Sequence, residues 1–273
     1  VYATGDLAGK LPGVAVSGAM KAIIDGGDKP DLILFPQNYE GRDVLSRLSV
    51  KLNKSVLTNS IDVAVDGDAD RIGLYNGKGD FIDSHHIILL LVHYLAKYKG
   101  MTGKVATAFS TTPRVKVMAD HYNLPSEVVK IGFKYIADIM VAEDVLVGGE
   151  ESGGIATKGH IPERDGIWMG LIIWEFMAKS GKTLDELIEE VYEIVNPFKF
   201  ERSDLHITEE LKQDIIANCE AGKYDSFGEY SIRNLETIDG FKYFLDDERW
   251  VMIRPSGTEP VLRVYAEAPT LEE

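Results

Sequence analysis

Short apolar runs alternate with amphipathic stretches through most of the chain. Runs rich in β-branched and other apolar residues predict strands at residues 32–35, 61–65, 71–75, 104–109, 128–131 and 145–148. Apolar residues at helical spacing predict helices at residues 14–24, 42–52, 85–98, 113–121, 134–143, 166–179 and 184–195. This alternation predicts an α/β fold with βαβ layers and a mostly parallel sheet.

The same pattern divides the chain into three parts. We expect an α/β segment at residues 1–62, a second α/β domain at residues 63–195, and a smaller α+β domain at residues 196–273 that ends in strands 250–253 and 261–268. Asn196 and Pro197 mark the boundary before the last part, because proline cannot continue the preceding helix.

Composition narrows the possible partners. The 44 acidic and 29 basic residues give a net charge of -15, which repels nucleic acid and anionic membranes, so we expect neither as a partner. An anionic ligand must therefore meet a local basic cluster. The longest apolar run, residues 87–92, is too short to span a bilayer, and the first residues lack the features of a signal peptide. The single cysteine, Cys219, agrees with a reducing cytoplasm.

Three aspartates, Asp66, Asp68 and Asp70, stand at alternate positions after the strand-like run 61–65. In an extended segment alternate side chains share a face, so the three carboxylates are expected to converge on one divalent cation. Mg²⁺ suits such a cluster because it takes carboxylate oxygens and bridges transferring phosphoryl groups. Arg71 would then stabilise the charge of such a group.

Two other interpretations compete with this metal site. An EF-hand calcium loop also begins with alternating aspartates, but it needs Gly where Arg71 stands and Glu where Gly77 stands, so it fails twice. A solvated acidic turn is the remaining alternative.

A glycine-rich run at residues 148–154 follows a strand-like segment, and its glycines allow close approach of the backbone to a ligand. Glu150 and Ser152 within it offer acceptors and a donor for sugar hydroxyls. An exposed Gly-rich turn is an equally good account of this loop alone. Lys134 and Arg164 supply further cations nearby in sequence, although each alone is more typical of a surface.

A second ligand loop lies between the last two predicted strands. Arginine, two hydroxyls and a glycine amide in one tight turn can hold a phosphate from several sides. The residues concerned are Arg254, Ser256, Gly257 and Thr258, with Arg263 on the adjoining strand. An ordinary Pro/Ser/Gly hairpin turn is the alternative.

These motifs in this order resemble the α-D-phosphohexomutases, the family of phosphoglucomutases and phosphomannomutases, from about residue 63 to the C-terminus. DGDADR (66–71) resembles their magnesium loop, GEESGG (149–154) their sugar-binding loop and RPSGTEP (254–260) their phosphate-binding loop. The resemblance implies an enzyme that moves a phosphoryl group between the 1 and 6 positions of a hexose phosphate, through a phosphoserine and a hexose 1,6-bisphosphate.

The resemblance also implies a role for each matching residue. Asp66, Asp68 and Asp70 would bind Mg²⁺, and Arg71 and Lys134 would act in the transfer. Glu150, Ser152 and Arg164 would bind the sugar phosphate. The phosphate that is not reacting would be bound by Arg254, Ser256, Gly257, Thr258 and Arg263.

The sequence departs from that family in one important feature. A Thr-Ala-Ser-His-Asn-Pro-like loop, which carries the family's phosphoserine, does not occur in it. Ser84-His85 is the nearest match, but it lacks Asn-Pro and is expected to begin a helix, so we assign it no catalytic role. We therefore expect a truncated mutase or, alternatively, a phosphosugar-binding module without turnover.

Residues 1–62 resemble a different family, the α subunit of electron transfer flavoproteins. The segments that carry this resemblance are PDLILF (30–35), GRDVLSRL (41–48) and LTN (57–59). We predict a chimera joined within residues 61–68, where both families have similar sequences. The flavin-binding half of that subunit does not occur in the sequence, so no FAD site is expected. A flavoprotein interaction subunit remains a third possible function.

Overall fold

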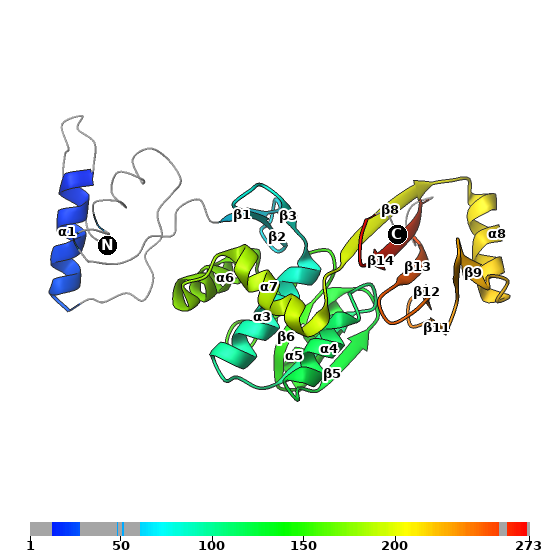
Figure 1. Ribbon diagram of the computed structural model, residues 1–273, viewed down its shortest axis with the longest axis horizontal. Helices are drawn as coiled ribbons and strands as arrows, with labels where there is room; N and C mark the ends of the chain where they lie inside the picture. The colour runs from blue at the N-terminus through cyan, green and yellow to red at the C-terminus, as the bar shows by residue number, and fades with distance from the viewer. Residues whose placement is uncertain (1–12, 28–47, 49–50, 52–60, 257–260, 272–273) are drawn as a thin grey trace. The chain divides into compact units, whose positions relative to one another are not determined.

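The computed structural model describes residues 13–27, 48, 51, 61–256 and 261–271 (Figure 1). The chain separates into two compact units, residues 1–60 with 178–181, and residues 61–177 with 182–273. In the first unit, α1 (Gly13–Asp25) confirms the helix expected at residues 14–24. The strand expected at residues 32–35 lies outside the described residues, as does the helix expected at 42–52 except for Leu48 and Lys51.

From residue 61 to residue 195 the elements largely follow the expected order. They are β1 (Ile61–Val65), β2 (Ile72–Asn76), β3 (Phe81–Ile82), α3 (Ser84–His93), the π-helical turn η1 (Tyr94–Tyr98), β4 (Lys104–Ala108), α4 (Arg114–His121), β5 (Ser126–Val129), α5 (Phe133–Ala142), β6 (Val145–Gly149), β7 (Ile155–Thr157), α6 (Gly166–Ser180) and α7 (Leu184–Val195).

The C-terminal part is built mainly from strands. Its elements are β8 (Lys199–His206), α8 (Glu209–Glu220), β9 (Ser226–Phe227), β10 (Tyr230–Ser231), β11 (Asn234–Glu236), β12 (Phe241–Phe244), β13 (Trp250–Pro255) and β14 (Val261–Ala268).

The sheet β5-β4-β6-β7 confirms the α/β fold. Strands β5, β4 and β6 are parallel, because α4 and α5 each return the chain to the same edge, and β7 is antiparallel to β6. Helix α5 packs Phe133 and Ile136 against one face of the sheet. Helices α3, α4, α6 and α7 bury their apolar side chains in a second, larger core. The carboxyl end of the parallel strand β6 leads into the glycine-rich loop.

The parallel strands of the described chain lie in this sheet, as expected for the α/β domain, and the other large sheets are antiparallel. Strands β1, β2 and β3 form an antiparallel meander, and the C-terminal sheet β11-β12-β13-β14-β8 is antiparallel throughout. The reason is the length of the connections. The turn from Asn76 to Asp80 closes with a hydrogen bond from Asn76 N to Asp80 O at 3.0 Å, whereas a parallel crossover needs about a dozen residues or more.

Helix α3 is a fully buried helix, because all ten of its residues are buried. Its apolar run at residues 87–92 therefore belongs to the protein core, where each such side chain contributes roughly 1.5–3 kcal/mol. Among the described residues, no helix combines the length and apolar character that crossing a membrane requires.

Buried polar contacts join the C-terminal sheet to the α/β domain. Lys242 Nζ donates to Phe109 O at 3.1 Å and to Thr111 O at 2.9 Å, and burial lowers the pKa of this lysine to about 8. Arg114 Nε donates to Glu267 Oε1 at 3.1 Å, and both side chains are buried. These contacts fix the sheet against the carboxyl end of β4.

Asp83 begins α3 and provides the first testable prediction. Its Oδ1 accepts hydrogen bonds from His86 N at 3.1 Å and from His86 Nδ1 at 2.7 Å. Burial opposes ionisation, but the contacts with His86 hold the pKa of Asp83 below its ordinary value of 3.8. We expect Asp83→Ala to lower the free energy of unfolding by about 1 kcal/mol at pH 7, as measured by urea denaturation.

A matched control is Asp138→Ala, which removes an exposed carboxylate within α5 and should change stability by less than about 0.5 kcal/mol. Because the folded state keeps Asp83 ionised to lower pH than the unfolded state does, its stabilisation is present above about pH 4 and is lost as the pH falls further. A difference between wild type and Asp83→Ala that did not shrink in acid would contradict this assignment.

Candidate functional site

The three aspartates of the DGDADR loop converge as the sequence predicts. Asp66, Asp68 and Asp70 each place one carboxylate oxygen within 4.8 Å of the others. The backbone reason differs from the expected one, because β1 ends at Val65 and the segment that follows is a turn. Ala69 N donates to Asp66 O at 3.1 Å, and Ala69 has a φ of 60°. A tight turn, and not an extended strand, gathers the carboxylates.

The donor set fits a divalent cation. Three carboxylates supply hard oxygen ligands, which Mg²⁺ prefers. Asp70 Oδ1 is buried and has no hydrogen-bond partner among the described residues. Burial raises the pKa of Asp70, and so do the negative charges of Asp68 and Asp66. The positive charge of Arg164 opposes this rise. A cation would satisfy the orphaned oxygen and offset the mutual repulsion of the carboxylates.

Two arginines flank the triad. Arg71 Nε lies 3.5 Å from Asp66 Oδ2 and 3.7 Å from Asp70 Oδ1, and its side chain is half exposed. Arg164 Nη2 lies 2.6 Å from Asp70 Oδ2, and its guanidinium is 5.5 Å from the centre of the Phe133 ring. The triad therefore has positive charge beside it, which an anionic ligand in this acidic chain requires.

Backbone hydrogen bonds tie the triad loop to the glycine-rich loop at residues 149–154. Ile72 N donates to Gly153 O at 3.0 Å, and Arg71 forms a β-bridge with Gly154. A Cβ at Gly153 would lie 2.7 Å from Ile72 O, so only glycine permits this approach. Gly166, at the start of α6, donates its N–H to Ala69 O at 2.9 Å. Two loops distant in sequence thus form one backbone unit.

Glu150 is held in place within this unit. It is buried, and its Oε1 accepts a hydrogen bond from Gly132 N at 2.9 Å. Burial and the neighbouring charge of Glu151 raise the pKa of Glu150, while the Gly132 amide and Arg164 oppose that rise. Ser152 is exposed. The loop accordingly offers one fixed acceptor and one accessible hydroxyl.

Sequence analysis gave no role to Glu151, which contacts residues from three distant parts of the chain. Its carbonyl accepts a hydrogen bond from Ser84 Oγ, and its carboxylate accepts one from Ser110 Oγ. Arg202 Nη1, on β8 of the C-terminal sheet, lies 3.8 Å from Glu151 Oε1. No local pattern signals these contacts, because each partner is more than forty residues away along the chain.

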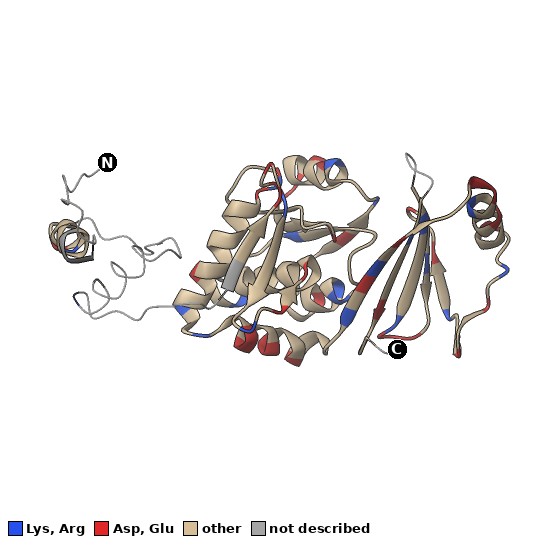
Figure 2. Cartoon of the chain, turned by 90° about the horizontal axis from the view of Figure 1, so that it is seen from above, with Lys and Arg blue, Asp and Glu red and all other residues tan. Residues whose placement is uncertain are grey.

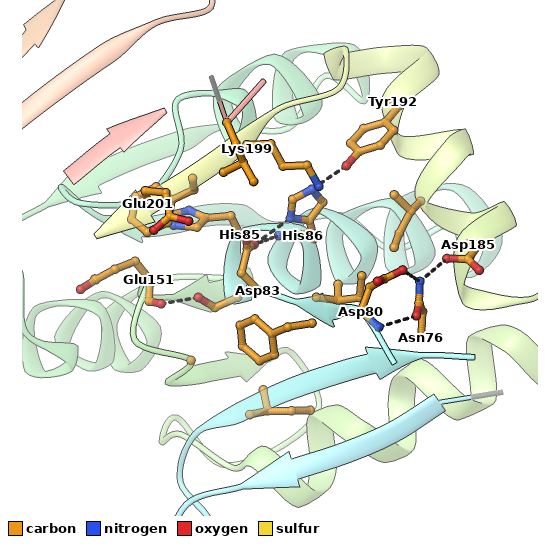
Figure 3. A pocket seen from close by; sticks show the side chains of 18 of the residues that line it. Asn76, Asp80, Asp83, His85, His86, Glu151, Asp185, Tyr192, Lys199 and Glu201 are labelled. Atoms are coloured by element: carbon orange, nitrogen blue, oxygen red, sulfur yellow. Dashed lines mark hydrogen bonds and ion pairs between the residues drawn. The ribbon is translucent and has the colours of Figure 1, made fainter. Parts of the chain in front are cut away.

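A cavity of about 680 Å³ lies beside the same loop (Figure 3). Its lining includes Ser84, His85, Glu151, Ser152, Lys199 and Glu201, but neither the aspartate triad nor Arg254. His85 Nδ1 accepts a hydrogen bond from Thr112 N at 3.0 Å, and burial lowers the pKa of His85 to about 4. The Ser84-His85 pair is therefore packed into the fold, in keeping with the expectation that it begins a helix.

Two of the phosphate-loop candidates, Arg254 and Arg263, lie on strands of the C-terminal sheet, in which basic and acidic segments neighbour each other (Figure 2). Arg254 and Arg263 face one another across β13 and β14. Asp239 carries two hydrogen bonds from Arg254, each 3.3 Å long, and Arg263 Nε lies 3.9 Å from Asp204 Oδ2. Ser256 is buried, and its N–H donates to Val261 O at 2.9 Å.

The remaining candidates are less informative. Gly257 and Thr258 lie outside the described residues. Lys134 is exposed on the first turn of α5, with its Nζ 4.7 Å from the centre of the Tyr135 ring. Its predicted part in the transfer remains a prediction.

Comparison with known protein families accounts for this arrangement. The model described as phosphoglucomutase/phosphomannomutase, alpha/beta/alpha domain III, matches residues 83–195, and that of the phosphoglucomutase/phosphomannomutase C-terminal domain matches residues 200–273. The two matches cover about two thirds of the chain. The chain belongs to the phosphoglucomutase/phosphomannomutase family.

Individual members of the phosphoglucomutase/phosphomannomutase family agree. A phosphoglucomutase/phosphomannomutase of Thermococcus kodakarensis is 30% identical over 211 residues, which cover 77% of this chain and 44% of that protein. A phosphoglucosamine mutase of Limosilactobacillus reuteri is 33% identical over 230 residues, which cover 81% and 46%. A solved structure of a candidate phosphomannomutase from Thermus thermophilus has a TM-score of 0.66 at 29% identity, over 83% and 46% of the two chains. The chain spans about half the length of the curated relatives it matches.

The metal assignment predicts the effect of a single substitution. Asp68→Asn removes one charged oxygen ligand, so we expect it to weaken Mg²⁺ binding at least tenfold, measured by isothermal titration calorimetry, without lowering the thermal stability of the fold. Asp138→Asn, on the exposed face of α5, removes the same charge elsewhere and should leave Mg²⁺ affinity unchanged. Equal Mg²⁺ affinity in wild type and Asp68→Asn would rule out the triad as the metal site.

Proposed function

We propose that this chain binds a hexose phosphate together with Mg²⁺ and carries most of the site of a phosphohexomutase. The reaction would move a phosphoryl group between the 1 and 6 positions of the sugar by way of a hexose 1,6-bisphosphate. One observation carries this proposal: the aspartate triad and the glycine-rich loop are joined by the backbone of Arg71 and Ile72 into a single unit.

The two ends of the site suit the two ends of the substrate. Asp66, Asp68 and Asp70 would hold Mg²⁺, which supplies charge neutralisation for the transferring phosphoryl group when bound. Arg71 and Arg164, beside them, donate to phosphoryl oxygens. Phosphoryl transfer depends mainly on positioning and charge neutralisation, which are what these groups offer.

The sugar and the second phosphate would be bound farther along the site. Glu150 accepts hydrogen bonds from hydroxyls, and Ser152 both accepts and donates them. Arg254, Arg263 and Ser256 would bind the phosphate that is not reacting, together with Gly257 and Thr258. Both phosphates of a bisphosphate would thus meet arginines within a chain that is acidic overall.

A second candidate function is binding without turnover. It is favoured by the sequence itself, in which no Thr-Ala-Ser-His-Asn-Pro-like loop supplies a phosphoserine. The sugar loop and the phosphate arginines do not depend on that loop for their own contacts. The single cysteine of the sequence favours a reducing compartment such as the cytoplasm as the location in either case.

Calorimetry and a coupled assay on this chain separate the two functions. We expect glucose 6-phosphate to bind in the presence of Mg²⁺ at least tenfold more tightly than glucose, because both arginine clusters recognise phosphate. Glucose 1-phosphate is then supplied with glucose 1,6-bisphosphate as primer. Formation of glucose 6-phosphate supports the mutase, and binding without conversion supports the binding module. No preference for glucose 6-phosphate over glucose would refute both.

We also propose that residues 1–62 derive from a segment like that of the electron transfer flavoprotein α subunit. Their separation as a compact unit from residue 61 onward supports a join near that point. Residues 62–273 make up less than four fifths of the chain. The phosphoglucosamine mutases that match 81% to 86% of the chain are therefore also aligned with residues before 62. A match that covers 86% of the chain begins at about residue 40 or before, so part of the proposed flavoprotein-like segment is aligned with the mutases as well.

A long sequencing read of the source DNA across the codons for residues 50–80 tests this origin. If the join arose during sequence assembly, we expect the flavoprotein-like segment to be missing from the read. If the fusion is natural, we expect the read to contain both segments. A continuous mutase-like sequence upstream would show that the roles proposed above belong to a longer enzyme.

A further inference from the structure

Asp239 occupies a special position between the two halves of the proposed site. It lies in the turn between β11 and β12, on the C-terminal sheet. Its Oδ1 accepts a hydrogen bond from Arg254 Nε and its Oδ2 one from Arg254 Nη2, both at 3.3 Å. Its Oδ2 also accepts a hydrogen bond from Ile131 N at 3.0 Å, and Ile131 belongs to the α/β domain. One carboxylate therefore bridges the two domains.

The residue on the other side of this bridge leads directly to the sugar loop. Gly132, next to Ile131, donates its N–H to Glu150 Oε1 at 2.9 Å. Consecutive amides of one short segment thus bind Asp239 and Glu150. The connection from Arg254 to Glu150 runs through the Asp239 carboxylate and the consecutive backbone amides of Ile131 and Gly132.

Local backbone geometry brings the turn that carries Asp239 close to β13. Gly132 has a φ of 131° and Gly240, next to Asp239, has a φ of 108°, values that L side chains rarely adopt. A Cβ at Gly240 would lie 2.9 Å from Ile253 O and 3.2 Å from Arg254 Cβ. The turn therefore lies in close contact with β13 at Arg254, the residue whose guanidinium is hydrogen-bonded to Asp239.

The contact leaves Arg254 able to bind a ligand. Asp239 engages the side edge of the guanidinium, formed by Nε and Nη2. The end of the group, with Nη1 and the second hydrogen of Nη2, points away from that carboxylate and can donate to phosphate oxygens. Both side chains are largely covered, with 25% of Asp239 and 20% of Arg254 exposed.

From these contacts we propose that Asp239 is a positioning residue, which fixes Arg254 at a set distance from Glu150 and so matches the site to the span between a sugar ring and its distal phosphate. The proposal rests on the function proposed above. A preorganised arginine loses less conformational entropy when phosphate binds, so affinity rises without any contact between Asp239 and the ligand.

The test is calorimetric titration of the full chain with glucose 6-phosphate in the presence of Mg²⁺. We expect Asp239→Asn to weaken binding by about tenfold, within the range typical of coupling between sites. Asp247→Asn removes the same charge from an exposed position of the same domain and should bind as wild type does. Unchanged Mg²⁺ affinity in Asp239→Asn shows that the fold persists, since Lys242 and Arg114 still join the domains.

A double-mutant cycle distinguishes positioning from a general structural effect. If Asp239 acts through Arg254, then Asp239→Asn should cause little further loss in an Arg254→Ala background, whereas a general effect would add in full. Wild-type affinity in Asp239→Asn, or full additivity with Arg254→Ala, overturns the proposal while the proposed function stands.

Hydrogen exchange decides the proposal even if wild type does not bind glucose 6-phosphate, the result that would refute the proposed function. Loss of Arg254 frees Asp239, so Arg254→Ala should accelerate amide exchange at Ile131 and Gly132 several-fold relative to Asp247→Asn. Unchanged exchange at these two amides would show that Asp239 does not couple Arg254 to the sugar loop.

Discussion

The hydrogen bonding between Arg71-Ile72 and Gly153-Gly154 is the constraint on which the candidate site depends. Without the contact from Ile72 N to Gly153 O, the aspartate triad and the sugar loop would be two separate turns. The contact requires glycine, since a side chain at Gly153 would collide with Ile72 O. Leaving such a buried backbone group unpaired costs about 1–3 kcal/mol. The close approach of the two loops also accompanies the ion pair between Arg164 and Asp70. Glu150 lies near enough to Arg164 for their charges to interact.

The C-terminal sheet is positioned by polar contacts more than by apolar area. Lys242 is buried against carbonyls of the α/β domain, and Arg114 is paired with Glu267. Buried ion pairs add little net stability because desolvation offsets their attraction, but they permit few alternative arrangements. Breaking one leaves an uncompensated buried charge, which disfavours arrangements of the sheet that lack these contacts. That position decides where Arg254 and Arg263 stand relative to the sugar loop.

Sequence patterns predict the elements of this fold because their signals are local, and they miss contacts between remote residues. Apolar periodicity located α4, α6 and α7 to within about a residue. The convergence of the aspartate triad was predicted from strand geometry, yet a turn with Ala69 at positive φ produces it, so residue types alone carried that prediction. Glu151 and Asp239 escaped notice because their partners, among them Ser110 and Ile131, come from distant parts of the chain. Such tertiary contacts leave no periodic trace.

Charge explains how an acidic chain can have a site for phosphate. The triad with Arg71 and Arg164 carries a formal net charge of -1, which a divalent cation reverses to +1. At the other end, Arg254 is paired with Asp239 through its side edge only, so its end remains able to donate. The excess of acidic residues over the whole chain acts at longer range and is screened beyond about 10 Å at moderate salt. Affinity for an anion is thus decided locally, by whether each arginine keeps a donor edge that its carboxylate partner does not occupy.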